Sequence, residues 1–181
     1  MRLSLQRHPD TPCAAVDRID AEASRLEAGG LALRFTVTGR IGALRVPPSA
    51  ISSRADELWR HTCFEAFVRP PTGEAYLELN LAPSTAWAAY RLAGYRAPLA
   101  PATDVAPPSL EVGLDKGQLM VAAAVTLASL PAHEPWRVGL SAVIEESDGR
   151  LSYWALAHPA GRPDFHHPDC FALELPAPER S

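Results

Sequence analysis

The chain has 181 residues, of which 47% are hydrophobic and 21% are charged. This ordinary globular balance excludes a wholly disordered chain. The formal net charge of −4 at pH 7 offers no basic surface, so we expect no nucleic-acid partner. The 18 prolines disfavour long helices, because proline in a helix interior costs about 3 kcal/mol. We therefore expect one domain over residues 1–181 that consists mainly of strands.

The cysteines and the apolar stretches bear on the compartment. The three cysteines are an odd number and lie far apart in the sequence, so they predict no disulfide framework. In a signal peptide an apolar run follows the first residues, and this sequence has no such run there. The most apolar stretch, residues 119–130, is too short to span a bilayer, which requires about 20 residues. We expect a cytoplasmic protein with no membrane partner.

The first part of the chain predicts a hairpin followed by a loop. In residues 31–37 apolar and polar side chains alternate, which is typical of a half-buried strand. The turn residues Gly29 and Gly30 precede this strand, so we interpret residues 16–26 as the first arm of a hairpin. Residues 47–57 contain prolines, serines and charged residues without a period, and they predict a loop.

Three further strands are expected in quick succession, over residues 61–69, 75–81 and 86–92. Proline, glycine and serine close these runs and indicate turns between them. The next stretch, residues 97–108, is rich in proline and alanine and has no period. We interpret it as a crossover loop within the same domain, because the segments on either side are each too short for a comfortable core of their own.

The second half of the chain repeats this organisation. Residues 110–114 and 118–127 predict one hairpin, and residues 136–146 and 150–157 predict another, because short loops with a glycine separate the arms. A last short strand is expected at residues 171–175. About ten strands with so few helical signals predict an all-β fold. The long crossover favours a two-sheet antiparallel β-sandwich, with a jelly-roll-like topology, over a closed barrel.

One surface of the predicted sheet collects side chains suited to binding. If residues 61–69, 75–81 and 86–92 pair in sequence, the two-residue period places six such side chains on one face. We expect the second hairpin to bring Trp154 close to them. Carboxylates and an amide suit a hydroxyl-rich ligand, and a tryptophan offers it a flat aromatic surface. A solvated outer face with space-filling tryptophans is the alternative. The six side chains are His61, Glu65, Glu78, Asn80, Trp87 and Arg91.

The segment HPAGRPDFHHPDC, residues 158–170, holds several side chains that can bind metals. Their spacing matches no zinc template, so we expect no metal site and interpret the segment as a loop pinned by its prolines. We place His166 and His167 of this loop at the rim of the predicted binding face. If the loop folded over Glu65, its histidines and His61 could act as acid–base groups, which leaves an enzyme as an alternative.

Three runs of sequence also resemble a known family: LWRHTCFEAF (58–67), YLELNLAPSTAWAAYRLAGYR (76–96) and LSYWALAHPAGRPDFHHPDCFALEL (151–175). Together they resemble the bacterial DOMON-like domain proteins, which are relatives of the DOMON superfamily and of the family-nine carbohydrate-binding modules. The resemblance covers nearly the whole chain. It implies a DOMON-like β-sandwich with a ligand site on one sheet.

The resemblance also implies roles for individual residues. Members of the superfamily bind sugars or haem. In the family-nine modules a tryptophan precedes a strand whose glutamate contacts the sugar, and Trp59 and Glu65 stand at similar positions here. A second tryptophan closes the other side of the sugar, and Trp154 or Trp87 would take that place. The haem-binding branch uses a methionine and a histidine, whereas Met120 lies in no matching motif.

Taken together, these observations predict a non-catalytic domain that binds a small molecule, a carbohydrate or a sugar-like metabolite. A haem- or metal-binding domain and an enzyme based on His61, Glu65 and the histidines of residues 158–169 are the alternatives. We expect no cofactor, and the sequence holds no signal for an oligomeric state. The predicted ligand-binding residues are Trp59, His61, Glu65, Glu78, Asn80, Trp87, Arg91, Trp154, His166 and His167.

Overall fold

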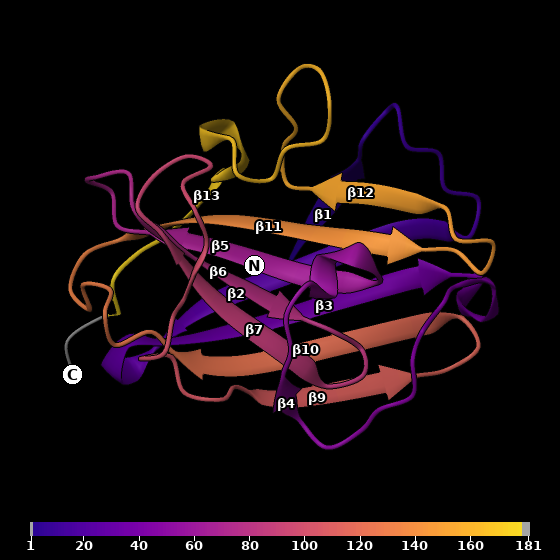
Figure 1. Ribbon diagram of the computed structural model, residues 1–181, viewed down its shortest axis with the longest axis horizontal. Helices are drawn as coiled ribbons and strands as arrows, with labels where there is room; N and C mark the ends of the chain where they lie inside the picture. The colour runs from indigo at the N-terminus through magenta and orange to yellow at the C-terminus, as the bar shows by residue number, and fades with distance from the viewer. Residues whose placement is uncertain (1, 179–181) are drawn as a thin grey trace.

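The computed structural model describes residues 2–178, and these form strands joined by loops and four single-turn 3₁₀ helices (Figure 1). None of the helices in this range has the length or the apolar character needed to cross a membrane. The helices are η1 (Glu27–Gly29), η2 (Ile41–Ala43), η3 (Leu58–Arg60) and η4 (Pro168–Cys170). The strands are β1 (Arg2–Arg7), β2 (Val16–Leu26), β3 (Gly30–Gly39), β4 (Ser53–Arg54), β5 (Cys63–Arg69), β6 (Tyr76–Leu81), β7 (Ala86–Leu92), β8 (Ala100–Pro101), β9 (Ser109–Leu114), β10 (Gln118–Thr126), β11 (Trp136–Glu145), β12 (Leu151–Ala155) and β13 (Leu173–Leu175).

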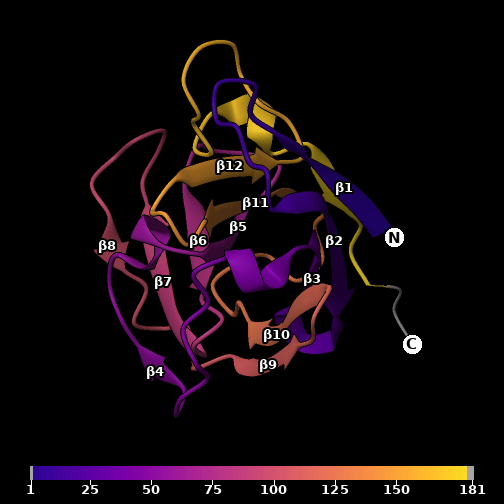
Figure 2. The same cartoon turned by 90° about the vertical axis from the view of Figure 1, so that its right-hand side faces the viewer.

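The strands form two layers that share one strand at a corner. Sheet A has the order β1-β2-β3-β10-β9, and sheet B has the order β4-β7-β6-β5-β11-β12. The first part of β1 pairs with β2, and its last two residues, Gln6 and Arg7, pair with β12, so β1 belongs to both sheets. Figure 2 shows the two layers curling around a common interior. The predicted two-sheet β-sandwich is confirmed, with one parallel pair, β4 with β7, among its antiparallel pairings.

The interior between the sheets is apolar. Alternate residues of each strand point into it, as the two-residue period of a strand requires. Phe35 of sheet A and Phe64 of sheet B meet across this interior with ring centroids 5.2 Å apart. Trp136 is completely buried there, and its indole N–H donates to the carbonyl of Pro131 at 2.9 Å. Because this core is continuous between the layers, it fixes the two sheets relative to each other.

A second, smaller apolar cluster lies on the outer face of sheet B. Its members on β5, β6 and β7 include Phe67, Tyr76 and Tyr90, and the loop residues Phe165 and Phe171 pack onto them. Loops around η3, after β7 and between β12 and β13 therefore cover this face. The consequence is that β5 and β6 are buried on both sides, apart from the end of β5. This double burial is what allows sheet B to hold polar side chains away from water.

The differences between the predicted and observed strands lie at the edges of the sheets. β1 has no sequence signal of its own, because its residues are mostly exposed and it closes a corner. β4 and β8 fall in the segments interpreted as loops, and each consists of two residues that pair with β7. Pairs this short depend on the neighbouring strand, so the local sequence carries no period that could reveal them.

Candidate functional site

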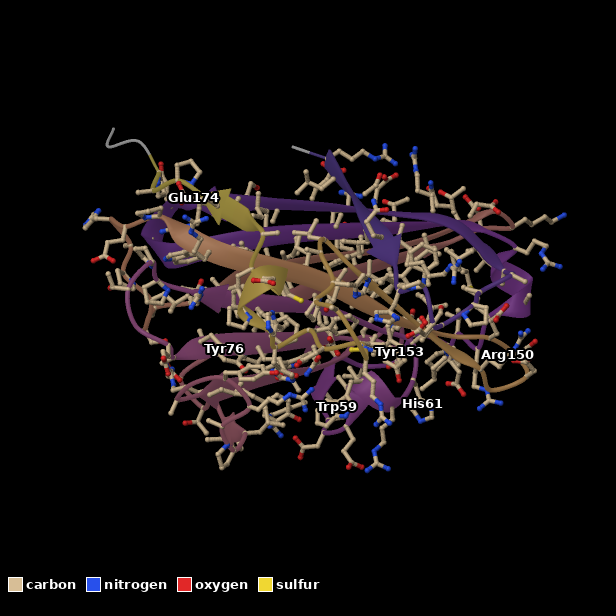
Figure 3. The ribbon with its side chains drawn as sticks, turned by 90° about the horizontal axis from the view of Figure 1, so that it is seen from above. Trp59, His61, Tyr76, Arg150, Tyr153 and Glu174 are labelled. Atoms are coloured by element: carbon tan, nitrogen blue, oxygen red, sulfur yellow. The ribbon has the colours of Figure 1, made fainter. Side chains whose placement is uncertain are left out.

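The outer face of sheet B holds a pocket of about 290 Å³ beneath its covering loops. We call it the loop-covered pocket. Figure 3 looks onto this face, with Trp59, Tyr76 and Tyr153 labelled on it. Strands β5, β6, β11 and β12 supply its floor, and the loops supply its walls. The floor consists of Glu65, Phe67, Glu78, Val143 and Tyr153, and the walls consist of Trp59, Arg96, Leu99, Pro163, Asp164, Phe165 and His166.

The pairing register explains why the polar residues of the floor meet. Glu65 on β5 lies opposite Asn80 on β6 and opposite Ser141 on β11. Glu78 lies two residues from Asn80 and pairs with Phe67, so it points to the same face. Glu65 and Glu78 are therefore diagonal neighbours, a relation that places residues about 7–8 Å apart within reach of long side chains. The predicted grouping of Glu65, Glu78 and Asn80 on one sheet face is observed.

The two carboxylates are removed from water although they line a pocket. Each residue is only 3% exposed. The hydroxyl of Ser141 donates to Glu65 Oε2 at 3.1 Å, and Asn80 Nδ2 donates to Glu78 Oε1 at 2.8 Å. The second oxygen of Glu78, Oε2, is buried and has no hydrogen-bond partner among the described residues. A buried acceptor without a partner costs about 1–3 kcal/mol, so this atom is poised to accept a hydrogen bond from a ligand.

Burial also changes how these carboxyl groups titrate. Removal from water, together with the negative charge of Glu78, raises the pKa of Glu65 to about 8. Burial raises the pKa of Glu78 to about 7, although the hydrogen bond from Asn80 acts in the opposite direction. Both shifts have the same physical cause, since a carboxylate loses its hydration inside a protein. Near neutral pH the pair can therefore hold or release a proton when its surroundings change.

The half-buried indole of Trp59 forms one wall of the pocket. It comes from η3, directly before β5, and it packs edge-on against Tyr90 with ring centroids 5.9 Å apart. The hydroxyl of Tyr90 donates to Asp56 Oδ1 at 2.6 Å, which ties the segment before η3 to β7. The indole therefore packs against the outer apolar cluster of sheet B and also lines the pocket.

The loop between β12 and β13 forms the opposite wall. The hydroxyl of Tyr76 on β6 lies 2.8 Å from His166 Nδ1. The hydroxyl of Tyr95 and the guanidinium of Arg96 both donate to Asp164 Oδ2, at 2.5 and 3.2 Å. The thiol of Cys170 donates to the carbonyl of Asp164 at 3.1 Å, which closes the loop on itself. These bonds hold the loop over the floor, and burial lowers the pKa of His166, which favours its neutral imidazole.

Two of the predicted histidines lie outside this pocket. His61 is exposed, and its Nδ1 lies 2.7 Å from Glu145 Oε2, in a separate hollow of about 490 Å³ that Arg45 also lines. His167 packs edge-on against Tyr95 and accepts the backbone N–H of Asp169 at 3.2 Å. Of the acid–base set considered for an enzyme, the loop-covered pocket brings together Glu65 and His166, whereas His61 does not line it.

The predicted placement of Trp87 and Arg91 beside Glu65 is wrong. The turn after β6 pairs Leu81 with Trp87 and Leu77 with Arg91. Trp87 therefore lies in the core between the sheets and is 7% exposed. Arg91 lies on the same side near the edge, where it is bonded to Asp104. The reason is parity: a shift of one residue in the register exchanges the two faces of a whole strand.

The predicted placement of Trp154 is wrong for the same reason. The turn between β11 and β12 pairs Ala142 with Trp154 and Val143 with Tyr153. Trp154 thus points into the core, where its indole N–H donates to the hydroxyl of Ser152 at 3.0 Å. Tyr153 takes the place on the outer face that was expected for the tryptophan.

Several pocket residues had no role in the sequence prediction. Tyr153 follows from the register once the turn is known, because it is adjacent to Trp154, which points the other way. The loop residues Arg96 and Phe165 carry no such signal, since their position depends on how long loops fold back over the sheet. The run of Leu77, Leu79 and Leu81 on β6 is a sequence signal that places Trp87 on the core face, because this apolar face must match Trp87 and Ala89 across the pair.

The residues considered for metal and haem binding lie in different parts of the fold. Within residues 2–178 no three His, Cys, Asp or Glu side chains gather so that they could hold a metal ion. Met120 lies on β10 of sheet A, between Thr36 and Gly113, and it is not a core residue. His166 lies over the outer face of sheet B. The core separates the two residues, so they cannot be the two axial ligands of one haem.

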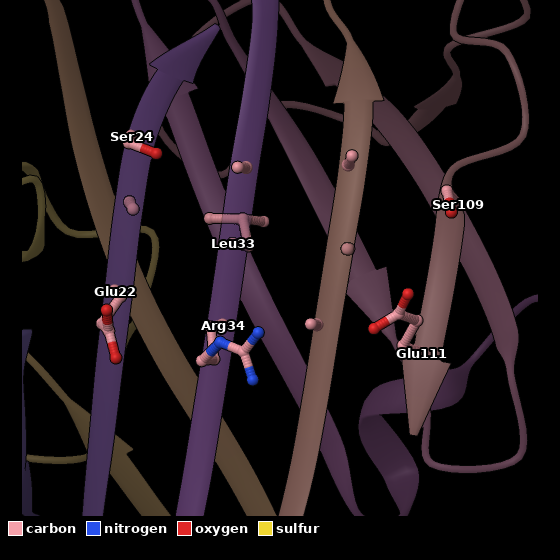
Figure 4. Close-up of a pocket in the computed structure, with 11 residues that line it drawn as sticks. Glu22, Ser24, Leu33, Arg34, Ser109 and Glu111 are labelled. Carbon is pink, nitrogen blue, oxygen red and sulfur yellow. The ribbon is translucent and has the colours of Figure 1, made fainter. Parts of the chain in front are cut away.

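A second hollow, of about 320 Å³, lies on sheet A (Figure 4). Small side chains from β2, β3, β10 and β9 form its base, and the charged residues Glu22, Arg34 and Glu111 gather at one end. Among the described residues, its lining contains no aromatic side chain and comes from strands alone, whereas loops form the walls of the pocket on sheet B. It therefore lacks the features that hold a small ligand in a fixed orientation.

Comparisons with known proteins bear on the fold. Neither a protein-family model nor a curated protein sequence matches the chain. Among solved structures, a candidate carbohydrate-binding protein from Bacteroides uniformis is similar, with a TM-score of 0.66, 12% identity and 94% of this chain and 83% of that chain covered. A family-nine carbohydrate-binding module from Caldicellulosiruptor kristjanssonii is also similar. Its complex with glucose has a TM-score of 0.53, 12% identity and coverage of 98% and 86%.

The complex of a family-nine module of the same organism with cellotriose gives a consistent result. Its TM-score is 0.57, at 11% identity, with 100% of this chain and 84% of that chain covered. This chain shares the β-sandwich fold of these proteins. The likeness extends over most of each neighbour, so it includes both sheets. At 11–12% identity it shows the fold and leaves the ligand to be argued from the pocket.

Proposed function

We propose that this protein is a non-catalytic binding domain for a carbohydrate or a sugar-like metabolite, and that the loop-covered pocket holds the ligand. The observation that carries the proposal is the combination of a half-buried tryptophan wall with a buried carboxylate oxygen, Glu78 Oε2, that has no partner among the described residues. Two structural neighbours of the same fold are complexes with glucose and cellotriose, which supports this ligand class.

The chemistry of the pocket matches a sugar ring in two ways. Carboxylate oxygens accept hydrogen bonds from hydroxyl groups in fixed directions, and Glu65 and Glu78 offer such acceptors on the floor. The apolar faces of a sugar ring pack against aromatic side chains, and Trp59 and Tyr153 supply these at the wall and the floor. A volume of about 290 Å³ lies at the lower end of small-molecule sites, which favours a small saccharide over a long polymer.

The relation to the DOMON-like proteins forms part of this proposal. Trp59 and Glu65 are the two residues that resemble the sugar-contacting pair of the family-nine modules, and both line the same pocket. The second tryptophan of that family has no counterpart in Trp87 or Trp154, since both point into the core. We propose that Tyr153 takes over its role, because it is the aromatic residue that β12 presents to the pocket.

A titration with monosaccharides tests the proposal. Isothermal calorimetry of the wild-type protein with a panel of neutral and amine-bearing hexoses should detect binding to one site. The Trp59→Ala variant should lose at least tenfold in affinity, because it removes one wall of the pocket. Leu114→Ala is the matched control: Leu114 is 61% exposed at the end of β9 in sheet A, so affinity should stay unchanged.

Circular dichroism shows whether the variants fold, and Glu65→Gln provides a second variant of the pocket with nearly unchanged volume. If the whole panel fails to bind, or if Trp59→Ala and Glu65→Gln bind as the wild type does, the proposed function is wrong.

A further inference from the structure

The loop-covered pocket contains two acidic side chains whose charge, when they ionise, the protein itself does not balance. Glu65 and Glu78 are both 3% exposed, and neither forms an ion pair with a basic side chain among the described residues. Buried carboxylates are ordinarily paired with a cation, because burial of an unpaired charge is costly. Here each group receives one neutral hydrogen bond, from Ser141 or from Asn80, and Glu78 Oε2 receives none.

The other titratable groups around the carboxylates do not supply the missing cation. Arg96 lines the same pocket, but its guanidinium is bonded to Asp164, so the pair is neutral as a unit. Burial favours the neutral form of His166, whose Nδ1 already faces the Tyr76 hydroxyl. Three further groups of the face are not basic: Cys63 on β5 carries a thiol, and Tyr90 on β7 and Tyr153 on β12 carry phenols. Burial raises the pKa of the Cys63 thiol and of the Tyr90 phenol.

The walls of the pocket suit a cation as well. The aromatic residues Trp59, Phe67, Tyr153 and Phe165 all line it. The faces of such rings attract cationic groups, and the attraction grows when the cation is removed from water. A hard metal ion fits this environment poorly, because Ca²⁺ prefers six to eight oxygen ligands and Mg²⁺ retains several waters. An organic ammonium group requires only a few acceptors and tolerates aromatic neighbours.

We propose that the loop-covered pocket binds a ligand that carries a protonated amine, with the ammonium group donating to Glu78 Oε2 and facing Glu65. This inference rests on the proposed function, and it narrows the ligand to an amino sugar or a related hydroxylated amine. The ammonium group supplies the charge that the protein lacks, and the hydroxyl groups occupy the remaining acceptors of the floor. The selectivity follows from the carboxylates, because a neutral sugar of the same shape leaves them without a counter-charge.

Binding of such a ligand is coupled to protons. Burial raises the pKa of Glu65 to about 8 and of Glu78 to about 7, so the free protein holds protons on this pair at about pH 6.5. A bound ammonium group favours the charged carboxylates and lowers both pKa values. The complex with an amine therefore releases protons at this pH, whereas the complex with a neutral sugar releases fewer.

The experiment compares glucosamine with glucose, which differ by one amine in place of a hydroxyl group. Calorimetry at about pH 6.5, in two buffers of different ionisation enthalpy, gives the affinity and the number of protons released for each sugar. Glucosamine should bind at least tenfold more tightly than glucose, which corresponds to about 1.4 kcal/mol, and only glucosamine should release close to one proton. This comparison uses the wild-type protein and does not depend on any variant.

Variants connect the preference to the carboxylates. In Glu78→Gln the ratio of the two affinities should fall to near one and proton release should be lost, and Glu65→Gln should act in the same direction. Glu111→Gln is the matched control, since Glu111 lies in the hollow on sheet A and should leave the ratio unchanged. Ethanolamine and CaCl₂ serve as further probes, for an amine without a sugar ring and for a metal cation.

Each other outcome overturns a defined part of the account. Equal affinity for glucose and glucosamine overturns the amine inference and leaves the proposed function intact. Binding of ethanolamine without binding of any sugar supports the amine inference and overturns the carbohydrate function. A response to CaCl₂ that is lost in Glu78→Gln, with no response to amines, overturns the inference in favour of a metal site. Absence of binding for every probe overturns both.

Discussion

The two faces of sheet B are both buried, but they are buried for different purposes. Toward the core, the sheet presents the apolar side chains of Phe64, Leu77 and Trp87, which pack against sheet A. Toward the covering loops, the same strands present Glu65 and Glu78 beside aromatic rings. The side chains on the core face are apolar and only pack, whereas the outer face retains polar groups whose hydrogen bonds are incomplete.

This contrast shows how a candidate binding face can be distinguished from a core face when exposure cannot do so. Burial is nearly complete on both sides of β5 and β6. The distinguishing feature is the state of the polar atoms, because a folded core leaves few buried acceptors without partners. Retaining such groups costs free energy of folding, and a ligand that completes their bonds recovers it.

The largest expected effect separates the two faces through their tryptophans. Trp87→Ala should lower the free energy of unfolding by about 3–5 kcal/mol, because it leaves a cavity in the core. Trp59→Ala should lower it by only about 1 kcal/mol, the value of its edge contact with Tyr90, while ligand binding is lost. Urea unfolding of both variants measures the difference. A Trp59→Ala variant that is destabilised as strongly as Trp87→Ala would show that Trp59 belongs to the core.

A second prediction concerns pH. Glu65 and Glu78 have folded-state pKa values of about 8 and about 7, above the ordinary value of 4.5, so the native state binds more protons than the unfolded state between about pH 5 and 8. Their stabilising contribution is complete below about pH 4.5 and is lost as the pH rises through this window. The expected loss is on the order of a few kcal/mol.

Glu65→Gln/Glu78→Gln should remove most of this slope in urea unfolding curves recorded across the window. The contribution of the pair is the difference between the pH dependences of the free energy of unfolding in wild type and variant. The contributions of the other titrating groups are the same in both proteins and cancel in this difference. An identical slope in the two proteins would mean that the carboxyl groups are solvated in solution.

A third prediction tests how closely the covering loop lies on the sheet. Gly139 of β11 faces the loop, and a Cβ atom there would lie 2.9 Å from the carbonyl oxygen of Cys170. Gly139→Ala should therefore displace the loop and lower the free energy of unfolding by about 1–3 kcal/mol. Ligand affinity should fall as well, because Asp164 and His166 move with the loop. Unchanged stability and affinity would indicate that the loop does not rest on this strand.

The smallest effect is expected for Arg91→Ala. Arg91 forms an exposed ion pair with Asp104, with side chains 42% and 48% exposed, and it lies outside the pocket. Its removal should cost less than about 1 kcal/mol and leave affinity for any pocket ligand unchanged. Loss of binding in this variant would show that Arg91 lies on the same face as Glu65, as the sequence pattern predicts. It would contradict the observed register.

Much of the architecture follows from local sequence. The alternation in residues 31–37 and the glycines between the predicted arms identify the main strands and hairpins, because period and turn chemistry are local properties. Grouping Glu65, Glu78 and Asn80 needs one further assumption, that consecutive strands pair. β1 escapes prediction because it serves as the corner between the sheets, and its pairing partners are far apart in the sequence.

The candidate site is less predictable from the sequence than the strands are. It depends on the strand register, which decides the face on which each side chain lies, and on the path of long loops. The two-residue period predicts the wrong face for Trp87 and Trp154, because it does not encode the turn geometry that sets the register. The loop wall, with Arg96 and Phe165, arises from long-range contacts such as that of Tyr76 with His166. No local pattern specifies where such a loop comes to rest.

The most direct test of the account uses the four tryptophans as reporters in one NMR experiment. Three of the four indoles, those of Trp87, Trp136 and Trp154, lie in the core, and the indole of Trp59 lies at the pocket wall. During titration with glucosamine, the indole N–H signal of Trp59 should shift with saturation while the other three stay in place. A shift of a core indole with no change at Trp59, or no saturable shift of any indole with any monosaccharide, would contradict the assignment of the ligand site.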